Sequence, residues 1–217
     1  MTELIIFDLD NTLLAGDSDR NWGIFLAEQK VVESSYLDES EKFYNNYYEG
    51  SLDIDGFLSF CLKPLIENDM NYLLKLRQKF IEEKIKPIIT VPGQEIISQA
   101  IKDKKTVIIA TATNDFVTQP IADLFNVPTL ISTEFEIKDN NFTGKVLNIP
   151  CFREGKLNKV QQWADDNNFN LSEATFYSDS FNDLPLLEKV KTPIIVDGDD
   201  KLIKIGKDKD WECVSFR

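Results

Sequence analysis

Short runs of consecutive apolar residues recur along the chain, at residues 4–7, 106–110, 129–132, 174–177 and 192–196. Polar or turn-forming residues bound each run, a pattern typical of strands that are buried on both faces. Between most of the runs, apolar residues recur at helical spacing, as at Leu157, Val160 and Ala164. Because strands and helices alternate in this way, the pattern predicts an α/β fold whose parallel sheet is covered by helices on both faces.

The stretch between the first two predicted strands is far longer than a single crossover helix needs. Within it, residues 15–86 are rich in aromatic side chains and show apolar positions at helical spacing. We therefore predict a helical bundle, residues 15–86, inserted into an α/β core formed by residues 1–14 and 87–217. The alternating segment 134–146 departs from the pattern of buried strands and predicts a small hairpin.

Composition restricts the chemistry, because the 217 residues include no histidine. Catalysis by serine or cysteine with a histidine base is excluded, and so are zinc sites with imidazole ligands. Acid–base chemistry must then come from carboxylates, lysine or tyrosine. The net charge of −13 repels phosphate backbones and anionic membranes, so we expect neither nucleic acid nor a membrane as a partner.

Cysteine usage and hydropathy indicate the cellular compartment in which the protein is expected. The three cysteines, Cys61, Cys151 and Cys213, form no CxxC motif, which favours a reducing compartment, and we expect all three to be buried. No apolar run approaches the roughly 18 residues that span a membrane, and no basic region precedes the first run. These features predict a cytoplasmic protein.

The strongest chemical signal is Asp8-Leu9-Asp10-Asn11-Thr12, which directly follows the first apolar run. Ligands of open parallel sheets bind beyond the carboxyl ends of strands, so both carboxylates are expected at the functional edge of the sheet. The alternative is a polar turn that does no more than end the strand.

Four later residues add to this signal. Asp179 and Asp183 follow the run at 174–177, and two such carboxylates can converge on a divalent cation such as Mg²⁺, although helix capping explains them equally well. Thr111 ends the run at 106–110, where a hydroxyl and free backbone N–H groups can hold a phosphate or cap a helix. Lys156 stands at a predicted helix start and opposes the helix dipole there, so local stability does not explain it, although a single lysine is most often a solvated surface residue.

In this order, the residues resemble the four motifs of the haloacid dehalogenase superfamily: an Asp-x-Asp-x-Thr, a Ser or Thr at a strand end, a lysine and a late acidic pair. The resemblance spans nearly the whole chain and implies a Rossmann-like core. Through it, Asp8 is expected to be the nucleophile that forms an aspartyl-phosphate, and Asp10 the general acid and base. It also implies Mg²⁺ held by Asp8, Asp179 and the backbone carbonyl of Asp10, with Asp183 ordering the water shell of the ion.

The same resemblance implies the contacts of the substrate. Lys156 is expected to bind Asp8 and a phosphate oxygen, and Thr111 to hold other phosphate oxygens. Further substrate contacts are expected from Thr12, Ala112 and Asn182.

A helical insert directly after the first motif resembles the phosphoserine phosphatase-like branch, in which a cap closes over small phosphorylated metabolites. A glutamate at the cap entrance of that branch holds the substrate ammonium, and Asp17 stands at this position here, with a solvated loop as the alternative. The second and fourth motifs differ from those of phosphoserine phosphatases, since residues 111–113 read Thr-Ala-Thr and residues 178–180 read Ser-Asp-Ser. The lysine also comes two positions later, so Lys159 is a second candidate for its role.

This combination looks like a sister group described as histidinol-phosphatase-like. We therefore predict a Mg²⁺-dependent phosphatase that acts on a small amino-alcohol phosphate, such as histidinol phosphate or phosphoserine. A phosphotransferase or mutase with the same aspartyl-phosphate stays open. So does a non-catalytic module that binds phosphate or Mg²⁺, although such a module has no need of Asp10 beside Asp8.

Overall fold

A computed structural model describes residues 3–217 of the chain and contains a sheet of seven strands in the order β4-β3-β2-β1-β5-β6-β7. All neighbouring strands are parallel except β3 and β4, which form an antiparallel hairpin. This arrangement confirms the predicted α/β fold and the predicted hairpin. The strands are β1 (Leu4–Phe7), β2 (Thr106–Asn114), β3 (Thr129–Lys138), β4 (Asn141–Leu147), β5 (Thr175–Ser178), β6 (Thr192–Val196) and β7 (Glu212–Val214).

Successive residues of β1 face opposite sides of the sheet, as the strand periodicity requires. Ile5 and Phe7 belong to one buried apolar cluster and Leu4 and Ile6 to another. Helices cover both clusters, which explains why the strand is apolar at every position. The helices of the α/β layers are α5 (Val91–Lys102), α6 (Asp115–Leu124), α7 (Glu154–Asp166), α8 (Leu184–Leu187) and α9 (Asp200–Asp208).

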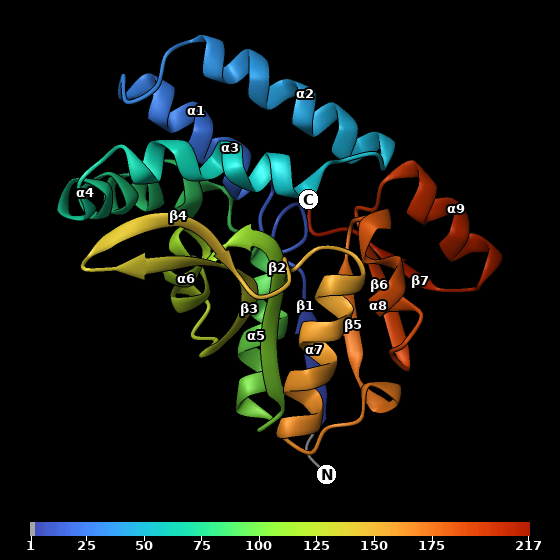
Figure 1. The fold of residues 1–217 in the computed structure, drawn as a ribbon. Coiled ribbons are helices and arrows are strands. Elements are labelled where there is room, and N and C mark those ends of the chain that lie inside the picture. Colours follow the sequence, from blue (N-terminus) through green and yellow to red (C-terminus); the bar gives the residue numbers. More distant parts are fainter. Residues whose placement is uncertain (1–2) are drawn as a thin grey trace.

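Of the five α-helices between β1 and β2 along the chain, the first four lie above the edge of the sheet at which β1 ends (Figure 1). Aspartates at positions 17, 53 and 69 cap three of them by accepting hydrogen bonds from backbone N–H groups of the first turn. A π-helical turn, Ile81–Ile85, and a 3-10 turn, Lys86–Ile88, lead back to the sheet. The four helices are α1 (Ser18–Glu28), α2 (Ser35–Glu49), α3 (Ile54–Ile66) and α4 (Met70–Phe80).

The chain enters and leaves this helical segment at the same place. Leu14 and Ile89 form an antiparallel bridge, and the backbone N–H of Thr90 donates to the carbonyl of Leu13 at 3.0 Å. Adjacent entry and exit points are what an inserted unit requires. We therefore propose that residues 15–86 form a cap on a core of residues 1–14 and 87–217.

Two local expectations from the sequence were wrong. Strand β2 continues past residue 110 to Asn114, so Thr111 lies within a strand and Asn114, not Thr111, caps the following helix. The segment after Trp211 adds the edge strand β7 beside β6. Cys213 lies on this edge strand and is exposed, whereas Cys61 and Cys151 are buried as expected.

Within residues 3–217, none of the helices combines the length and the apolar character that a membrane crossing needs.

Candidate active site

The carboxyl ends of three neighbouring strands meet at one point below the helices α1–α4. Strand β1 lies between β2 and β5, with Phe7 in register with Ile109 on one side and Tyr177 on the other. The residues that come next on these strands therefore lie close to one another. They are Asp8 after β1, residues 110–111 of β2 and Ser178 at the end of β5. Three segments that are far apart in the sequence thus supply one site, as expected at this edge of a parallel sheet.

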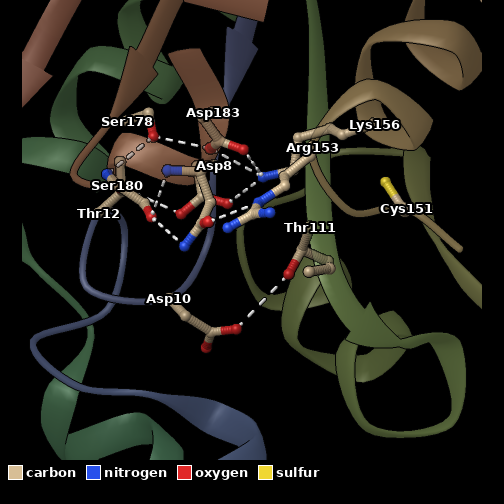
Figure 2. Close-up of polar contacts among 12 residues, drawn as sticks. Asp8, Asp10, Thr12, Thr111, Cys151, Arg153, Lys156, Ser178, Ser180 and Asp183 are labelled. Carbon is tan, nitrogen blue, oxygen red and sulfur yellow. Dashed lines mark hydrogen bonds and ion pairs between the residues drawn. The ribbon is translucent and has the colours of Figure 1, made fainter. Parts of the chain in front are cut away.

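Lys156 joins two carboxylates at the centre of the site (Figure 2). Its Nζ lies 2.8 Å from Oδ1 of Asp8 and 2.7 Å from Oδ1 of Asp183. The lysine side chain is only 3% exposed, so solvent screens these charges very little. Two buried carboxylates therefore share a single buried cation.

Burial and charge shift the pKa values of this cluster in opposing ways. Burial raises the pKa of Asp8 to about 7, against the effect of Lys156, and Asp183 adds to the increase. Burial alone would lower the pKa of Lys156, but Asp183 and Asp8 together raise it well above its usual value. The lysine therefore stays charged, whereas burial favours the protonated form of Asp8.

Thr12 connects Asp8 to the second acidic motif. Its hydroxyl lies 3.3 Å from Oδ2 of Asp8 and 3.3 Å from Oδ1 of Asp179, and it donates to one of them at a time. Burial raises the pKa of Asp179 well above its ordinary value, and the charges of Asp8 and Asp183 raise it further. Thr12 is fully buried and does not line the cavity, so the geometry supports a positioning role in place of the direct substrate contact that we expected.

Asp10 points to a different part of the site, toward β2 and the first turn of α1. Its Oδ2 accepts from the hydroxyls of Thr113 at 2.8 Å and Thr111 at 3.5 Å, and its Oδ1 accepts from the backbone N–H of Ser18 at 2.6 Å. Burial raises the pKa of Asp10 despite these donors. A carboxyl group with a raised pKa and a fixed orientation is suited to give and take protons.

Asp183 is held from two sides. Besides its contacts with Lys156, its Oδ2 accepts a hydrogen bond from the Ser178 hydroxyl at 2.7 Å. Ser178 Oγ in turn accepts from the backbone N–H of Ser180 at 3.2 Å. Both oxygens of Asp183 thus have protein partners, which fits the expectation that it acts around a bound ion more than as its main ligand.

A cavity opens between this cluster and the helices α1 and α2. Asp8, Asp183 and Lys156 form part of its wall, as do Asp10, Thr111 and Ala112. On the side of the helices, the wall contains Asp17, Asp19 and several aromatic side chains. Ala112 and Asp17 thus lie where a substrate contact is expected of them, whereas Asp179 does not line the cavity.

Asn182 lines the cavity but is engaged in a contact between the sheet side and helix α2. Its Oδ1 accepts from Nε of Arg153 at 2.9 Å, and its Nδ2 lies 3.5 Å from the carbonyl of Tyr47. The same arginine donates to the carbonyl of Gly50, which ends α2 in a left-handed conformation, at 2.6 Å. Asn182 therefore joins the helices to the sheet side, and the direct substrate contact expected of it is not supported.

The structure distinguishes between the two lysines that were candidates for the contact with Asp8. Nζ of Lys159 donates to the carbonyl of Ser132 at 2.7 Å and lies 3.0 Å from Oε1 of Glu134, on strand β3. Lys156, one helical turn earlier, is the one that contacts Asp8.

The donor set of the site fits a hard divalent cation. Asp8 and Asp179 both have raised pKa values, chiefly because they are buried, which means that their ionised forms lack sufficient positive charge nearby. Their oxygens, with the backbone carbonyl of Asp10, are the ligand type that Mg²⁺ prefers. Among residues 3–217, no three acidic, cysteine or histidine side chains are grouped closely enough to hold a metal by themselves, so backbone and water oxygens would complete the coordination.

Sequence reasoning missed several residues of the site. Thr113 contacts Asp10, and its signal was available, because residues two apart on a strand point to the same side and Thr111 was already a candidate. Asp19 carried only a weak signal in the Gly-Asp-Ser-Asp segment. The roles of Ser178 and Arg153 had no recognisable signal, since serine and arginine are common in loops.

Comparison with known proteins is consistent with this geometry. The family model described as haloacid dehalogenase-like hydrolase matches residues 5–188. A histidinol-phosphatase from Neisseria meningitidis serogroup C is 37% identical, and the match covers 100% of both chains.

Two solved structures have the same fold. A protein of unknown function from Bordetella pertussis Tohama I has a TM-score of 0.92 and 33% sequence identity, and the match covers 100% of both chains. A substrate-bound phosphoserine phosphatase has a TM-score of 0.73 and 18% identity, with 99% of this chain and 93% of that chain covered. The second likeness concerns the fold alone, because its sequence identity is low.

Proposed function

Because the chain belongs to the haloacid dehalogenase-like hydrolase family, we propose that it is a phosphatase that hydrolyses a small phosphomonoester through an aspartyl-phosphate intermediate. The observation that carries this proposal is the position of Lys156 between Asp8 and Asp183 in the wall of a cavity. A phosphate brought to this point would meet a carboxylate nucleophile and a buried cation at the same time.

The first step belongs to Asp8. One of its carboxylate oxygens attacks the phosphorus, the bond from phosphorus to the ester oxygen breaks, and the electron pair of that bond leaves with the alcohol. Lys156 holds Asp8 through a 2.8 Å contact and offers positive charge to the phosphate oxygens as charge develops on them. Thr12, which lies on the other oxygen of Asp8, limits rotation of the carboxylate.

Asp10 donates a proton in the first step and accepts one in the second. In its protonated form, which its raised pKa favours, it gives its proton to the leaving alcohol. In the second step it takes a proton from water as the water oxygen attacks the phosphorus. The bond between phosphorus and Asp8 then breaks, which releases phosphate and restores the free carboxylate. Thr113 and the backbone of Ser18 hold Asp10 in place for both transfers.

Mg²⁺ is the proposed cofactor, held by Asp8, Asp179 and the backbone carbonyl of Asp10. When bound, it would neutralise the carboxylates and the phosphate dianion, which otherwise repel one another in a buried site. Asp183 stays on Lys156 and Ser178 and would order the water around the ion.

The finer part of the proposal concerns the substrate, a small amino-alcohol phosphate. Asp17 supports it, because this aspartate lines the cavity and burial raises its pKa well above the usual value, with Asp10 and Asp19 adding to the increase. A positively charged amine at this point would relieve the repulsion among the three carboxylates. The name of the Neisseria meningitidis relative, histidinol-phosphatase, agrees with such a substrate. The reaction takes place on a small molecule, with neither nucleic acid nor a membrane as a partner, in the cytoplasm.

The test is hydrolysis of p-nitrophenyl phosphate with Mg²⁺, with Asp8→Asn as the control. We expect phosphate release that a chelator abolishes and that the variant lacks. Turnover no greater than that of Asp8→Asn would contradict the proposed enzyme. Strict dependence of phosphate release on an added acceptor alcohol would instead indicate a phosphotransferase that uses the same aspartyl-phosphate.

A further inference from the structure

The wall of the cavity formed by helix α1 contains an aspartate that the reaction itself does not use. Asp19 lies one residue after Ser18 in the first turn of α1 and lines the same cavity as Asp8 and Lys156. It contacts side chains from three other elements. Its Oδ2 accepts from the Tyr44 hydroxyl at 3.1 Å and from Sγ of Cys61 at 3.5 Å, and its Oδ1 accepts from Nδ2 of Asn114 at 3.4 Å.

None of these three partners of Asp19 carries a positive charge. Burial raises the pKa of Asp19 to about 6, and the charge of Asp10 adds to this effect. Asp17, two residues earlier, uses one oxygen to cap α1 through the backbone N–H of Arg20. Two neighbouring carboxylates therefore face the cavity with only neutral hydrogen-bond donors around them.

The positive charges nearest to this wall are already engaged. Of the described residues that line the cavity, Lys156 is the only basic one, and it is bound to Asp8 and Asp183. Arg20 pairs with Glu41 at 2.6 Å, and Arg153 donates to Asn182 and to the carbonyl of Gly50. A carboxylate on the substrate would thus find no cation to bind here and would meet two carboxylates of like charge.

Aromatic side chains form much of the rest of this wall, together with Leu52 and Ile54. Phe43, Tyr44 and Phe57 pack against one another, with ring centroids 5.5 Å apart for Phe43 and Phe57 and 5.9 Å apart for Tyr44 and Phe57. All three line the cavity beside Asp19, and Tyr47 and Phe152 extend the aromatic surface toward the reaction centre. Such a surface suits a flat ring or the face of a cation.

On the basis of the proposed function, we propose that Asp19 determines substrate specificity and that the cavity selects a phosphomonoester with an amine and a flat basic ring but no carboxylate. The phosphate lies at Asp8 and Lys156, the amine at Asp17, and an N–H of the ring at Asp19, with the ring against Tyr44 and Phe57. Of the two substrates considered above, histidinol phosphate has these features. Phosphoserine has a carboxylate and no ring.

A purely structural role for Asp19 predicts a different outcome. If Asp19 served only to join three elements by hydrogen bonds, it would support the shape of the site for every ligand. Its loss would then weaken the binding of all phosphomonoesters by the same factor. As a specificity residue, it changes the ratio of affinities between ligands that differ only in the part that faces it. The ratio of dissociation constants between such ligands is therefore the decisive measurement.

The experiment measures dissociation constants by calorimetry with Mg²⁺ on the Asp8→Asn protein, which does not turn the esters over. The three ligands are histidinol phosphate, phosphoethanolamine, which has the amine without the ring, and phosphoserine. We expect histidinol phosphate to bind on the order of 100-fold more tightly than phosphoserine, with phosphoethanolamine between them. Adding Asp19→Asn is expected to reduce that ratio to about 10-fold, since a buried charged hydrogen bond is lost. Asp55→Asn, an exposed aspartate on α3, is the matched control and keeps the ratio.

Two results would overturn the proposal. One is that phosphoserine binds as tightly as histidinol phosphate. The other is that Asp19→Asn weakens the binding of all three ligands by the same factor. Failure of the proposed function has a separate signature, because it is the absence of turnover by the native protein. The binding ratios decide the present proposal whichever way that assay turns out.

Discussion

The two walls of the cavity use the same residue type in opposite ways. On the sheet side, Asp8 and Asp183 share a lysine that the protein itself supplies, 2.8 Å and 2.7 Å away. On the helix side, Asp17 and Asp19 have neutral hydrogen-bond donors and no cation of the protein. The first wall already has a cation of the protein beside its carboxylates, to which the proposed Mg²⁺ would be added. The second is left for the substrate to complete, and a wall of this kind can distinguish one substrate from another.

The largest effect is expected from removing the nucleophile on the sheet side. Asp8→Asn keeps the size of the side chain but removes the attacking carboxylate, so turnover of p-nitrophenyl phosphate should fall by at least about 10⁴-fold. The measurement is initial-rate kinetics with Mg²⁺ at saturating ester. A loss of less than tenfold would show that Asp8 is not the nucleophile.

Removing Lys156 tests the two ion pairs that it forms with Asp8 and Asp183 in the sheet-side wall. Lys156→Met leaves two buried carboxylates without their cation, so the free energy of unfolding should fall by about 3–5 kcal/mol and activity should be lost. Urea unfolding of both proteins at pH 8 measures the difference. The matched control is Lys159→Met, which loses a partly exposed pair with Glu134 and a hydrogen bond to the carbonyl of Ser132, so the expected loss is smaller, about 1–2 kcal/mol. Equal losses for the two variants would refute the distinction between the lysines.

A smaller and more selective effect is expected on the helix side. Asp17→Ala removes a carboxylate that we place on the amine of the substrate. The preference for phosphoethanolamine over an alkyl phosphate without an amine, as a ratio of kcat/KM, should then fall about tenfold. An unchanged ratio would mean that Asp17 only caps helix α1.

The smallest effect concerns pH and again distinguishes the two walls. Because burial raises the pKa of Asp19 to about 6, it is ionised at pH 8 and protonated at pH 5. Tyr44 and Cys61, which face it, have raised pKa values and stay neutral over this range, while Asp10 and Asp17 have raised values and add repulsion. The advantage of the native chain over Asp19→Asn in binding histidinol phosphate should therefore decrease from about tenfold at pH 8 to near unity at pH 5.

Comparing the two variants cancels the titration of the phosphate and of every ligand group that does not face residue 19. Dissociation constants for both, each in the Asp8→Asn background, are measured across this range. An advantage that does not change with pH would show that the charge of Asp19 is not what the ligand senses.

Much of the fold could be predicted because buried parallel strands are apolar at every position. Strands β1 and β6 have the predicted limits, and the polar residues that follow β1 and β5 belong to the site. Strand β2 was predicted too short, since Thr111 and Thr113 are polar although they lie within it. Edge strand β7 was missed because a short half-exposed strand has no continuous apolar run.

The sequence alone determined which residue types stand at the carboxyl ends of the strands, and from these the order of the motifs and the kind of chemistry. Local hydropathy suffices for this, because a strand end is defined by its own few residues. Only the tertiary structure decided between Lys156 and Lys159, brought Thr113 onto Asp10 and placed Asp19 among Tyr44, Cys61 and Asn114. Those contacts join elements that are distant along the chain, so they depend on how helices and strands pack and leave no local pattern in the sequence.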